Sequence, residues 1–303
     1  MPSTAEPRIG CFGKLPIAGD FIRGDAAVPE LAAFDAWIEP GLYRSQQRLG
    51  TAFQAQWDAL PAVRFLWRSA PGAPLLTGWL AASRDAAGRR YPFVIAAALP
   101  AGNPAALTPT WLQPFVAGAK ALLDGTWRGL DPVGVAATVA ALPRGGDADA
   151  AAQQLARERA VTAVATAWQG LTASPELLVD ELAELAAASP APSYGLRWPT
   201  RGEEVDAAFW LDALAHFGVS GAMLLIWQTA TATLAGGARL VLGRLDPRTF
   251  HGMLFPALDD DDAYDLGRFV DGNRVAAAER RFGGVVKAGS HTAALATLRQ
   301  GAR

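Results

Sequence analysis

The stretch of sequence at residues 10–23 reads GCFGKLPIAGDFIR, a short apolar run followed directly by a segment rich in turn-forming residues. The apolar run, which begins at residue 8, predicts a buried strand because it is short and is closed by a glycine. The glycines and the proline that follow allow or impose unusual backbone angles, so they predict a shaped loop. Lys14, Asp20 and Arg23 lie on this loop beside two phenylalanines. The loop is therefore either a structural clamp or a recognition surface.

The pattern Gly-x-x-Gly-Lys in this loop looks like half of a phosphate-binding P-loop. A P-loop has four residues between its glycines, so that successive backbone N–H groups can surround the phosphates, and a Ser or Thr after its lysine to hold magnesium. Here two residues separate Gly10 from Gly13, and Leu15 follows Lys14. Nucleotide binding is therefore not expected at this loop.

Composition and charge argue against several classes of partner. Hydrophobic residues make up 51% of the 303 positions, which is ample apolar material for a large core. The formal net charge of −2 leaves no basic field to attract nucleic acid or anionic lipid. The amino terminus lacks a signal peptide, and no apolar run approaches the roughly 20 residues that cross a bilayer. We expect a cytoplasmic protein without membrane insertion, in which the single Cys11 is buried.

Apolar periodicity and turn signals predict strands that alternate with helices along the chain. Strands are expected over residues 8–12, 63–69, 75–83, 92–99, 194–198, 222–228, 231–234 and 239–242, with Gly236-Gly237 as a hairpin turn. Helices are expected from Pro29 to a break at Pro40-Gly41, and over residues 42–59, 111–123, 133–142, 150–168, 175–188, 205–217 and 247–254. This order predicts an α/β fold, a layered α/β sandwich whose mostly buried sheet is flanked by helices on both faces.

A polar, glycine-rich segment at residues 144–149 is the best internal boundary. It predicts an amino-terminal α/β region over residues 1–145 and a second α/β half over residues 146–257, packed on the first. The more polar residues 258–303 are expected to form a peripheral carboxy-terminal extension of helix and coil.

The residues that commonly carry catalysis or bind metals are few and dispersed. None of His216, His251 and His291 has a Ser, Asp or Glu at a spacing that suggests a triad, and no Gly-x-Ser-x-Gly elbow occurs. The histidines and the cysteine show no paired spacing typical of zinc. The acidic run at residues 259–262 lacks the alternating ligands of a calcium loop and is better interpreted as a solvated turn. We expect no catalytic residue, cofactor or metal.

A second dense segment, RDAAGRRYPF at residues 84–93, offers two interpretations. Arg89 and Arg90 could bind a carboxylate or phosphate on a partner. Alternatively, one of them pairs with a buried acid such as Asp20 or Asp35 and pins the loop. Further along the chain, Trp198 is either a packing residue or an exposed interface anchor.

Several short motifs follow one another in a specific order. They are GKLP at residues 13–16, GDF at 19–21 followed by Arg23, FDAWI at 34–38, RF at 64–65, GWL at 78–80, SRD at 83–85, GRRYPF at 88–93 and YGLRW at 194–198. Together they resemble the signature of the type VI secretion-associated protein family TagF, also called ImpM, with Tyr91 where Phe is usual and Arg197 where a second Trp is common. The resemblance is strong over residues 8–99, moderate to about residue 254 and absent beyond.

The resemblance implies a cytoplasmic accessory protein of a Gram-negative bacterium with an α/β sandwich fold and no enzymatic activity. It also implies a post-translational repressor of secretion that acts through the forkhead-associated scaffold protein. Together with this resemblance, the missing catalytic constellation and the two charged, aromatic loops motivate the leading hypothesis, a non-catalytic regulatory binding protein.

The candidate partner-binding or motif residues are Lys14, Asp20, Arg23, Asp35, Trp37, Asp85, Arg89, Arg90 and Trp198. Two alternatives stay open at this point. The chain could be a hydrolase-like enzyme that uses Asp20, Lys14 or His216 in a cleft between its halves, or a structural component of the secretion apparatus.

Overall fold

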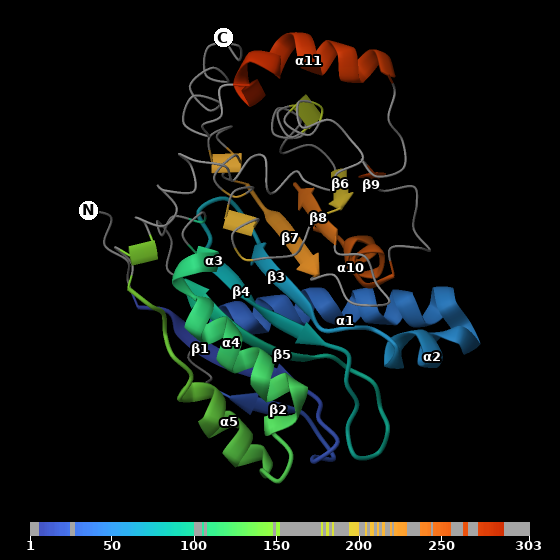
Figure 1. Ribbon diagram of the computed structural model, residues 1–303. Helices are drawn as coiled ribbons and strands as arrows, with labels where there is room; N and C mark the ends of the chain where they lie inside the picture. Colours follow the sequence, from blue (N-terminus) through green and yellow to red (C-terminus); the bar gives the residue numbers. More distant parts are fainter. Residues whose placement is uncertain are drawn as a thin grey trace.

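The computed structural model (Figure 1) describes residues 6–24, 28–99, 105, 108–147, 150–151, 177, 180–181, 184, 194–199, 204, 207–208, 211, 214–215, 219, 221–228, 237–243, 245–255, 263–265 and 272–287. Most of the helix predicted over residues 150–168, the strand predicted over residues 231–234, and His216 and His291 lie outside these residues. Of the helices that are described, none is long and apolar enough to cross a membrane.

The strands of the described residues form a single nine-stranded sheet in the order β2-β1-β5-β4-β3-β7-β8-β6-β9. The strands are β1 (Arg8–Gly13), β2 (Ile22–Gly24), β3 (Val63–Arg68), β4 (Leu75–Ala81), β5 (Phe93–Leu99), β6 (Tyr194–Pro199), β7 (Met223–Gln228), β8 (Gly237–Leu242) and β9 (Ala263–Asp265). Neighbouring strands are antiparallel except β6 and β9, which are parallel. Strand β7 pairs with β3, so residues from both sides of the boundary predicted near residue 145 share one sheet.

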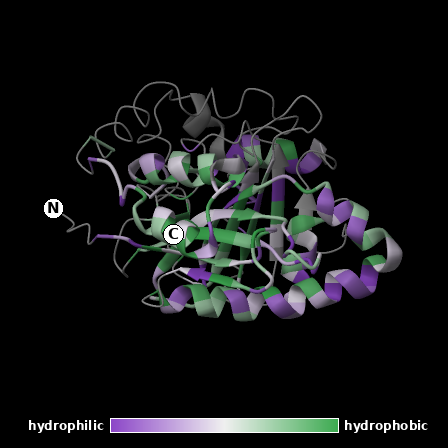
Figure 2. Cartoon of the chain, turned by 90° about the horizontal axis from the view of Figure 1, so that it is seen from below, coloured by the Kyte–Doolittle hydropathy of each residue, from purple (hydrophilic) through white to green (hydrophobic). Residues whose placement is uncertain are grey.

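Helices cover both faces of the sheet. One layer contains α1 (Pro29–Leu49), α2 (Phe53–Asp58) and α10 (Pro247–Leu254), and the other contains α3 (Thr108–Trp111), α4 (Gln113–Ala121), the π-helical turn η3 (Leu122–Thr126) and α5 (Pro132–Ala140). Alternate residues of each strand enter opposite cores, as in β5, where Ile95 faces the α4 layer and Val94 the α1 layer. In Figure 2 the strands in the interior are largely green and apolar, whereas purple hydrophilic residues lie along the helices. The predicted layered sandwich is confirmed.

The prediction that a helix ends at Pro40-Gly41 is wrong. Helix α1 continues through Pro40. A proline inside a helix removes a backbone hydrogen bond and costs about 3 kcal/mol. The buried residues of α1, however, form one unbroken stripe on both sides of Pro40. They are Leu31, Phe34, Trp37, Ile38, Gly41, Leu42 and Ser45, which recur at helical spacing. Burial of this continuous face offsets the local cost, whereas the proline itself lies on the exposed side.

Two features of the strands also differ from the predictions. Gly237, predicted in a turn, is the first residue of β8 and lies opposite Gln228 of β7. The edge strands β2 and β9 have three residues each and were not predicted, since so few residues carry little periodicity. Within the predicted extension over residues 258–303, the described residues form β9 and the helix α11 (Gly272–Lys287).

Candidate functional site

The two charged loops meet because strand β1 is paired with β5. Gly13, the last residue of β1, lies opposite Phe93, the first residue of β5, so the β1–β2 and β4–β5 loops leave the same end of the sheet. Gly13 has a φ of 124°, and a Cβ atom there would lie 2.0 Å from the carbonyl oxygen of Pro92. Any other residue would push the loops apart. We call Lys14, Asp20, Phe21, Arg23, Asp35, Asp85, Arg89 and Tyr91 the loop cluster.

Asp85 is the centre of the loop cluster. One carboxylate oxygen lies 3.0 Å from Lys14 Nζ and accepts a hydrogen bond of 2.7 Å from Arg89 Nε. The other oxygen accepts hydrogen bonds from the backbone amides of Ala87 and Arg89, at 3.0 and 2.8 Å. Arg89 also donates to the carbonyl oxygen of Gly19 in the opposite loop. One carboxylate therefore fixes the turn of its own loop and joins that loop to the other.

The surroundings of Asp85 keep it ionised. Burial of the carboxyl group raises its pKa, but the hydrogen bonds from Lys14 and Arg89 outweigh this effect and lower the pKa to about 2. Lys14 is itself buried, with 7% of its surface exposed. A buried ammonium group requires a paired carboxylate, so Lys14 and Asp85 depend on each other.

Asp35 of helix α1 holds the other side of the loop cluster. It accepts hydrogen bonds from the Tyr91 hydroxyl and from Arg23. The Phe21 ring packs edge-on against Tyr91 with centroids 4.8 Å apart, and the Lys14 ammonium lies 5.2 Å from the Phe21 centroid. Burial and the hydrogen bond to Asp35 raise the pKa of Tyr91, so its hydroxyl stays a donor. Both loops are thereby anchored to α1.

The predicted partners of Arg89 and Arg90 are wrong. Neither arginine pairs with Asp20 or Asp35. Arg89 pairs with the buried Asp85 four residues earlier, and Arg90 makes a two-pronged contact with Asp58 at the end of α2, at 3.1 and 2.7 Å. The Asp20 carboxylate instead accepts a hydrogen bond from the backbone amide of Phe21. The acid that pins the loop lies within the loop itself, a local hydrogen-bonding pattern typical of aspartate in turns.

The two candidate tryptophans lie apart from the loop cluster. Trp37 is buried in the α1 layer, where it stacks on Phe34 and its ring nitrogen donates to the carbonyl oxygen of Asp246 at 3.3 Å. The backbone of Trp198 lies in β6 opposite Ala238, and its side chain is outside the described residues.

A second buried charged residue, Arg64, lies in the middle of the sheet. The sequence analysis did not name it as a candidate site residue. Arg64 of β3 makes a two-pronged ion pair with Glu204, with contacts of 2.9 and 3.2 Å, and donates to the carbonyl oxygen of Gly78 at 2.7 Å. Its guanidinium lies between the rings of Trp79 and Trp227, 5.7 and 5.0 Å from their centroids. We call these residues the sheet-centre cluster. The motifs RF and GWL, at residues 64–65 and 78–80, were the sequence signal for it.

The histidine and the cysteine among the described residues, His251 and Cys11, are both buried. The Nδ1 atom of buried His251 lies 3.0 Å from Ser45 Oγ, and this hydroxyl donates to the carbonyl oxygen of Gly41 at 2.9 Å, which joins α10 to α1. Burial raises the pKa of Cys11 to about 12, so its thiol is a poor nucleophile. In the part of the chain that the structure describes, no group of three or more His, Cys, Asp or Glu side chains could hold a metal ion.

These features define an α/β sandwich in which one domain brings two charged loops together at the end of an antiparallel sheet. Residues 10–142 match the family of the TagF N-terminal domain, which is type VI secretion system-associated. Residues 10–142 thus form a TagF N-terminal domain, and the resemblance seen in the motifs of this part of the chain is confirmed.

The structure is similar to the crystal structure of PA0076 from Pseudomonas aeruginosa PAO1. The TM-score is 0.51 at 20% sequence identity, and the match covers 82% of this chain and 94% of that chain. At this identity the similarity concerns the fold alone. A search of the curated proteins found no match.

Proposed function

We propose that this protein is a non-catalytic regulatory protein of the bacterial type VI secretion system, a cytoplasmic post-translational repressor that binds the forkhead-associated scaffold protein. The observation that carries the proposal is the TagF N-terminal domain over residues 10–142. The motifs of this domain build the loop cluster, and family resemblance supplies the partner and the direction of regulation.

The state of the charged groups favours binding over catalysis. A general acid or base needs a pKa near the working pH and access to a substrate. Lys14 is buried against Asp85, and the pKa of Asp85 is about 2. Asp20 is hydrogen-bonded to the neighbouring backbone. Two of the three residues on which a hydrolase would rest therefore hold loops in place, and the third, His216, lies outside the described residues.

The outer side of the loop cluster is suited to recognition. The side chains of Arg23 and Arg89 are 61% and 60% exposed, although each has a carboxylate partner that restrains it. Restraint of exposed side chains before binding lowers the entropy that is lost on association. The cluster thus presents preformed cationic groups at the protein surface.

Direct binding and secretion assays test the proposal together. We expect the purified full chain to bind the purified scaffold protein in calorimetry, and deletion of its gene to raise type VI secretion until the gene is restored. Replacement Arg23→Glu should weaken the complex, whereas Arg44→Glu, at an exposed position of α1 nine residues beyond Asp35, should not. Absence of a complex would contradict the proposal. Co-purification with assembled secretion particles at a fixed ratio would identify a structural component instead.

A further inference from the structure

A pocket of about 350 Å³ lies beside the loop cluster and is not explained by it. Its lining residues come from the two loops, strands β4 and β5, the end of α2, and the turn η3 with the residue after it. They are Leu15, Pro16, Asp58, Ala81, Ala82, Ser83, Arg84, Phe93, Leu123 and Trp127. The volume is at the lower end of the range for ligand pockets and suits a large side chain with a neighbouring polar group.

The loop cluster holds in place the two loops that line part of this pocket. Leu15 and Pro16 directly follow Lys14 in one loop, and Ser83 and Arg84 directly precede Asp85 in the other. The 3.0 Å contact between Lys14 and Asp85 therefore joins the two loops where they border the pocket. The carbonyl oxygen of Ser83 is held further by hydrogen bonds from the backbone amide of Tyr91 and from the ring nitrogen of Trp57. The walls are thus preformed for a ligand.

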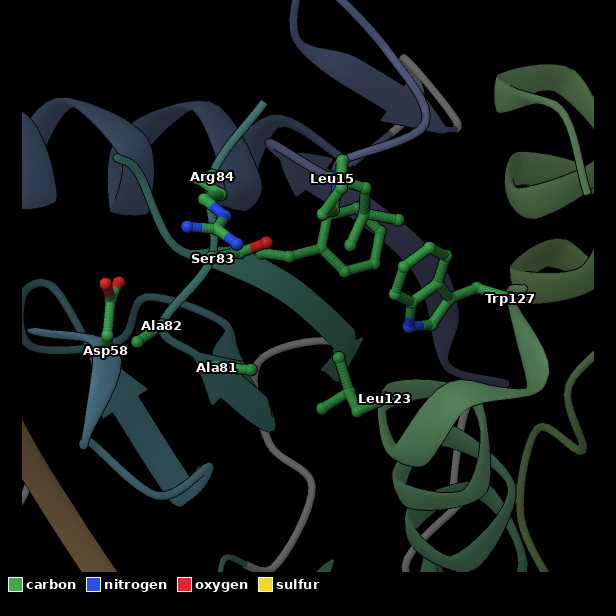
Figure 3. Close-up of a pocket in the computed structure, with 10 residues that line it drawn as sticks. Leu15, Asp58, Ala81, Ala82, Ser83, Arg84, Leu123 and Trp127 are labelled. Carbon is green, nitrogen blue, oxygen red and sulfur yellow. The ribbon is translucent and has the colours of Figure 1, made fainter. Parts of the chain in front are cut away.

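The remaining wall is an irregular turn with apolar side chains. Leu123 lies in the π-helical turn η3, and half-buried Trp127 follows it. Within the turn, Gly125 has a φ of 128°, which places it outside helical geometry. A glycine at positive φ is a common way for a helix to end, here helix α4. In Figure 3, Leu123 and Trp127 lie at one end of the pocket, with Asp58 and Arg84 at the other.

The polar end of the pocket carries an excess of positive charge. Asp58 is paired with Arg90, and this hydrogen bond together with the charges of Arg90 and Arg84 lowers the pKa of Asp58. Two arginines therefore face one carboxylate. Arg84 is exposed, and its guanidinium makes no hydrogen bond or ion pair with the residues that the structure describes. A bound ligand with an anionic group beside Arg84 would neutralise this excess positive charge.

We propose that this pocket, which we call the Arg84 pocket, binds a segment of a partner protein by an apolar side chain with an acidic residue next to it. The apolar side chain lies against Leu123 and Trp127, and the carboxylate pairs with Arg84. The inference rests on the proposed function in that the occupant belongs to a protein partner. It assigns a purpose to the Lys14–Asp85 pair, which joins the two loops that line the pocket.

Short peptides test the chemistry of the pocket without the partner. The probes are the blocked peptides Ser-Glu-Phe-Ser, Ser-Lys-Phe-Ser and Ser-Glu-Ser-Ser, added to the full chain labelled with nitrogen-15. The readout is the indole N–H signal of Trp127, assigned with Trp127→Phe. We expect the acidic, aromatic peptide to shift this signal and to bind about tenfold more tightly than either of the others, because one lacks the carboxylate that pairs with Arg84 and the other lacks the apolar side chain.

The variants separate the pocket from general effects on the fold. Arg84→Ala should weaken binding of the acidic, aromatic peptide about tenfold, and Arg84→Lys should restore part of it. Arg44→Ala is the matched control, because it removes an exposed arginine on α1 and should leave binding unchanged. Thermal unfolding of each variant verifies that the fold is retained. Equal binding of all three peptides, no shift, or an unchanged affinity of Arg84→Ala would overturn the inference.

Two further arms identify the occupant. If phenylacetate binds as tightly as the acidic, aromatic peptide, the pocket takes small acids and the inference of a protein segment fails. If the full chain binds the scaffold protein and Arg84→Glu binds it equally well, the pocket is not the docking site, although the proposed function stands. If the peptides bind at the pocket but the scaffold does not bind at all, the pocket inference is supported and the proposed function fails.

Discussion

The loop cluster and the sheet-centre cluster each bury a cation against a carboxylate, but they are built around opposite charges. In the loop cluster the hub is an acid, Asp85, which accepts hydrogen bonds from side chains and from the backbone of its own turn. In the sheet centre the hub is a cation, Arg64, which reaches from β3 to Glu204 and to the carbonyl oxygen of Gly78. The acid fixes the shape of two loops, whereas the arginine ties the TagF N-terminal domain to residues beyond it. Buried charge thus has two separate structural purposes in one sheet.

The largest expected effect is on the sheet centre. Arg64→Ala should lower the free energy of unfolding by about 3 to 5 kcal/mol, because it leaves Glu204 without its partner and empties the space between two tryptophans. Chemical denaturation measures the loss. Arg68→Ala is a control on the same strand, since Arg68 donates to the backbone carbonyl oxygens of Gly221 and Val219, and its effect should be smaller. A loss below 1 kcal/mol for Arg64→Ala would show that the pair does not tie the two parts together.

The next largest effect, that of Asp85→Ala, should be on the conformation of the β4–β5 loop more than on the stability of the whole protein. Asp85→Ala should lower the melting temperature less than Arg64→Ala does, yet it should open the β4–β5 loop, because four hydrogen bonds or ion contacts to the carboxylate vanish together. Trypsin cleavage after Arg84, Arg89 and Arg90, followed by mass spectrometry, detects the opening. Asp58→Ala is the control, since it releases Arg90 alone. Cleavage as slow as in the unchanged protein would contradict the assigned hub.

The pH dependence of the loop cluster follows from the pKa of Asp85. This pKa falls from an ordinary value of 3.8 to about 2 in the folded protein, so the folded state favours the ionised form. The stability that Asp85 contributes is therefore fully present above about pH 4 and is lost as the pH falls toward 2. The difference in melting temperature between the unchanged protein and Asp85→Asn should be constant from pH 7 to about 4.5 and shrink below it. A difference that already fades between pH 7 and 5 would refute this assignment.

The smallest effect is expected at the exposed end of the same loop. Arg90→Ala removes the ion pair with Asp58, whose side chain is 46% exposed, and should cost less than about 1 kcal/mol because water competes for such a pair. Denaturation at low and at high salt measures it, and salt should reduce the difference further. If Arg90→Ala lowered the free energy of unfolding as much as Arg64→Ala does, the exposed and the buried ion pair would contribute equally to stability, and this prediction would be wrong.

Much of the fold could be predicted because its signals are local. The strands β1, β3, β4, β5 and β7 are apolar runs bounded by turn residues, and Asp246 before Pro247 marks the start of α10. Pro40 was a misleading signal, since a single residue suggested a break while the buried stripe of α1 continued past it. In that helix, packing over many residues outweighed one local preference.

The candidate site was predicted only in part. The charged loops were recognised from their glycines, arginines and aromatic residues, but the partners of the arginines were not. Asp58 lies 32 positions from Arg90, and nothing in the local sequence connects them. Asp85 was named as a motif residue without its place as the hub. The Arg84 pocket could not be predicted at all, because its walls come from segments that only the sheet brings together.

By itself, the sequence determined the layered α/β architecture, the TagF signature and the positions of the shaped loops, since apolar alternation and backbone preference depend on neighbouring residues. The tertiary structure alone decided which charges are buried together and that a pocket opens beside Asp85. The physical reason is that an ion pair or a pocket depends on distances of a few ångströms. Such distances are set by the pairing of β1 with β5 and of β3 with β7, across long separations along the chain.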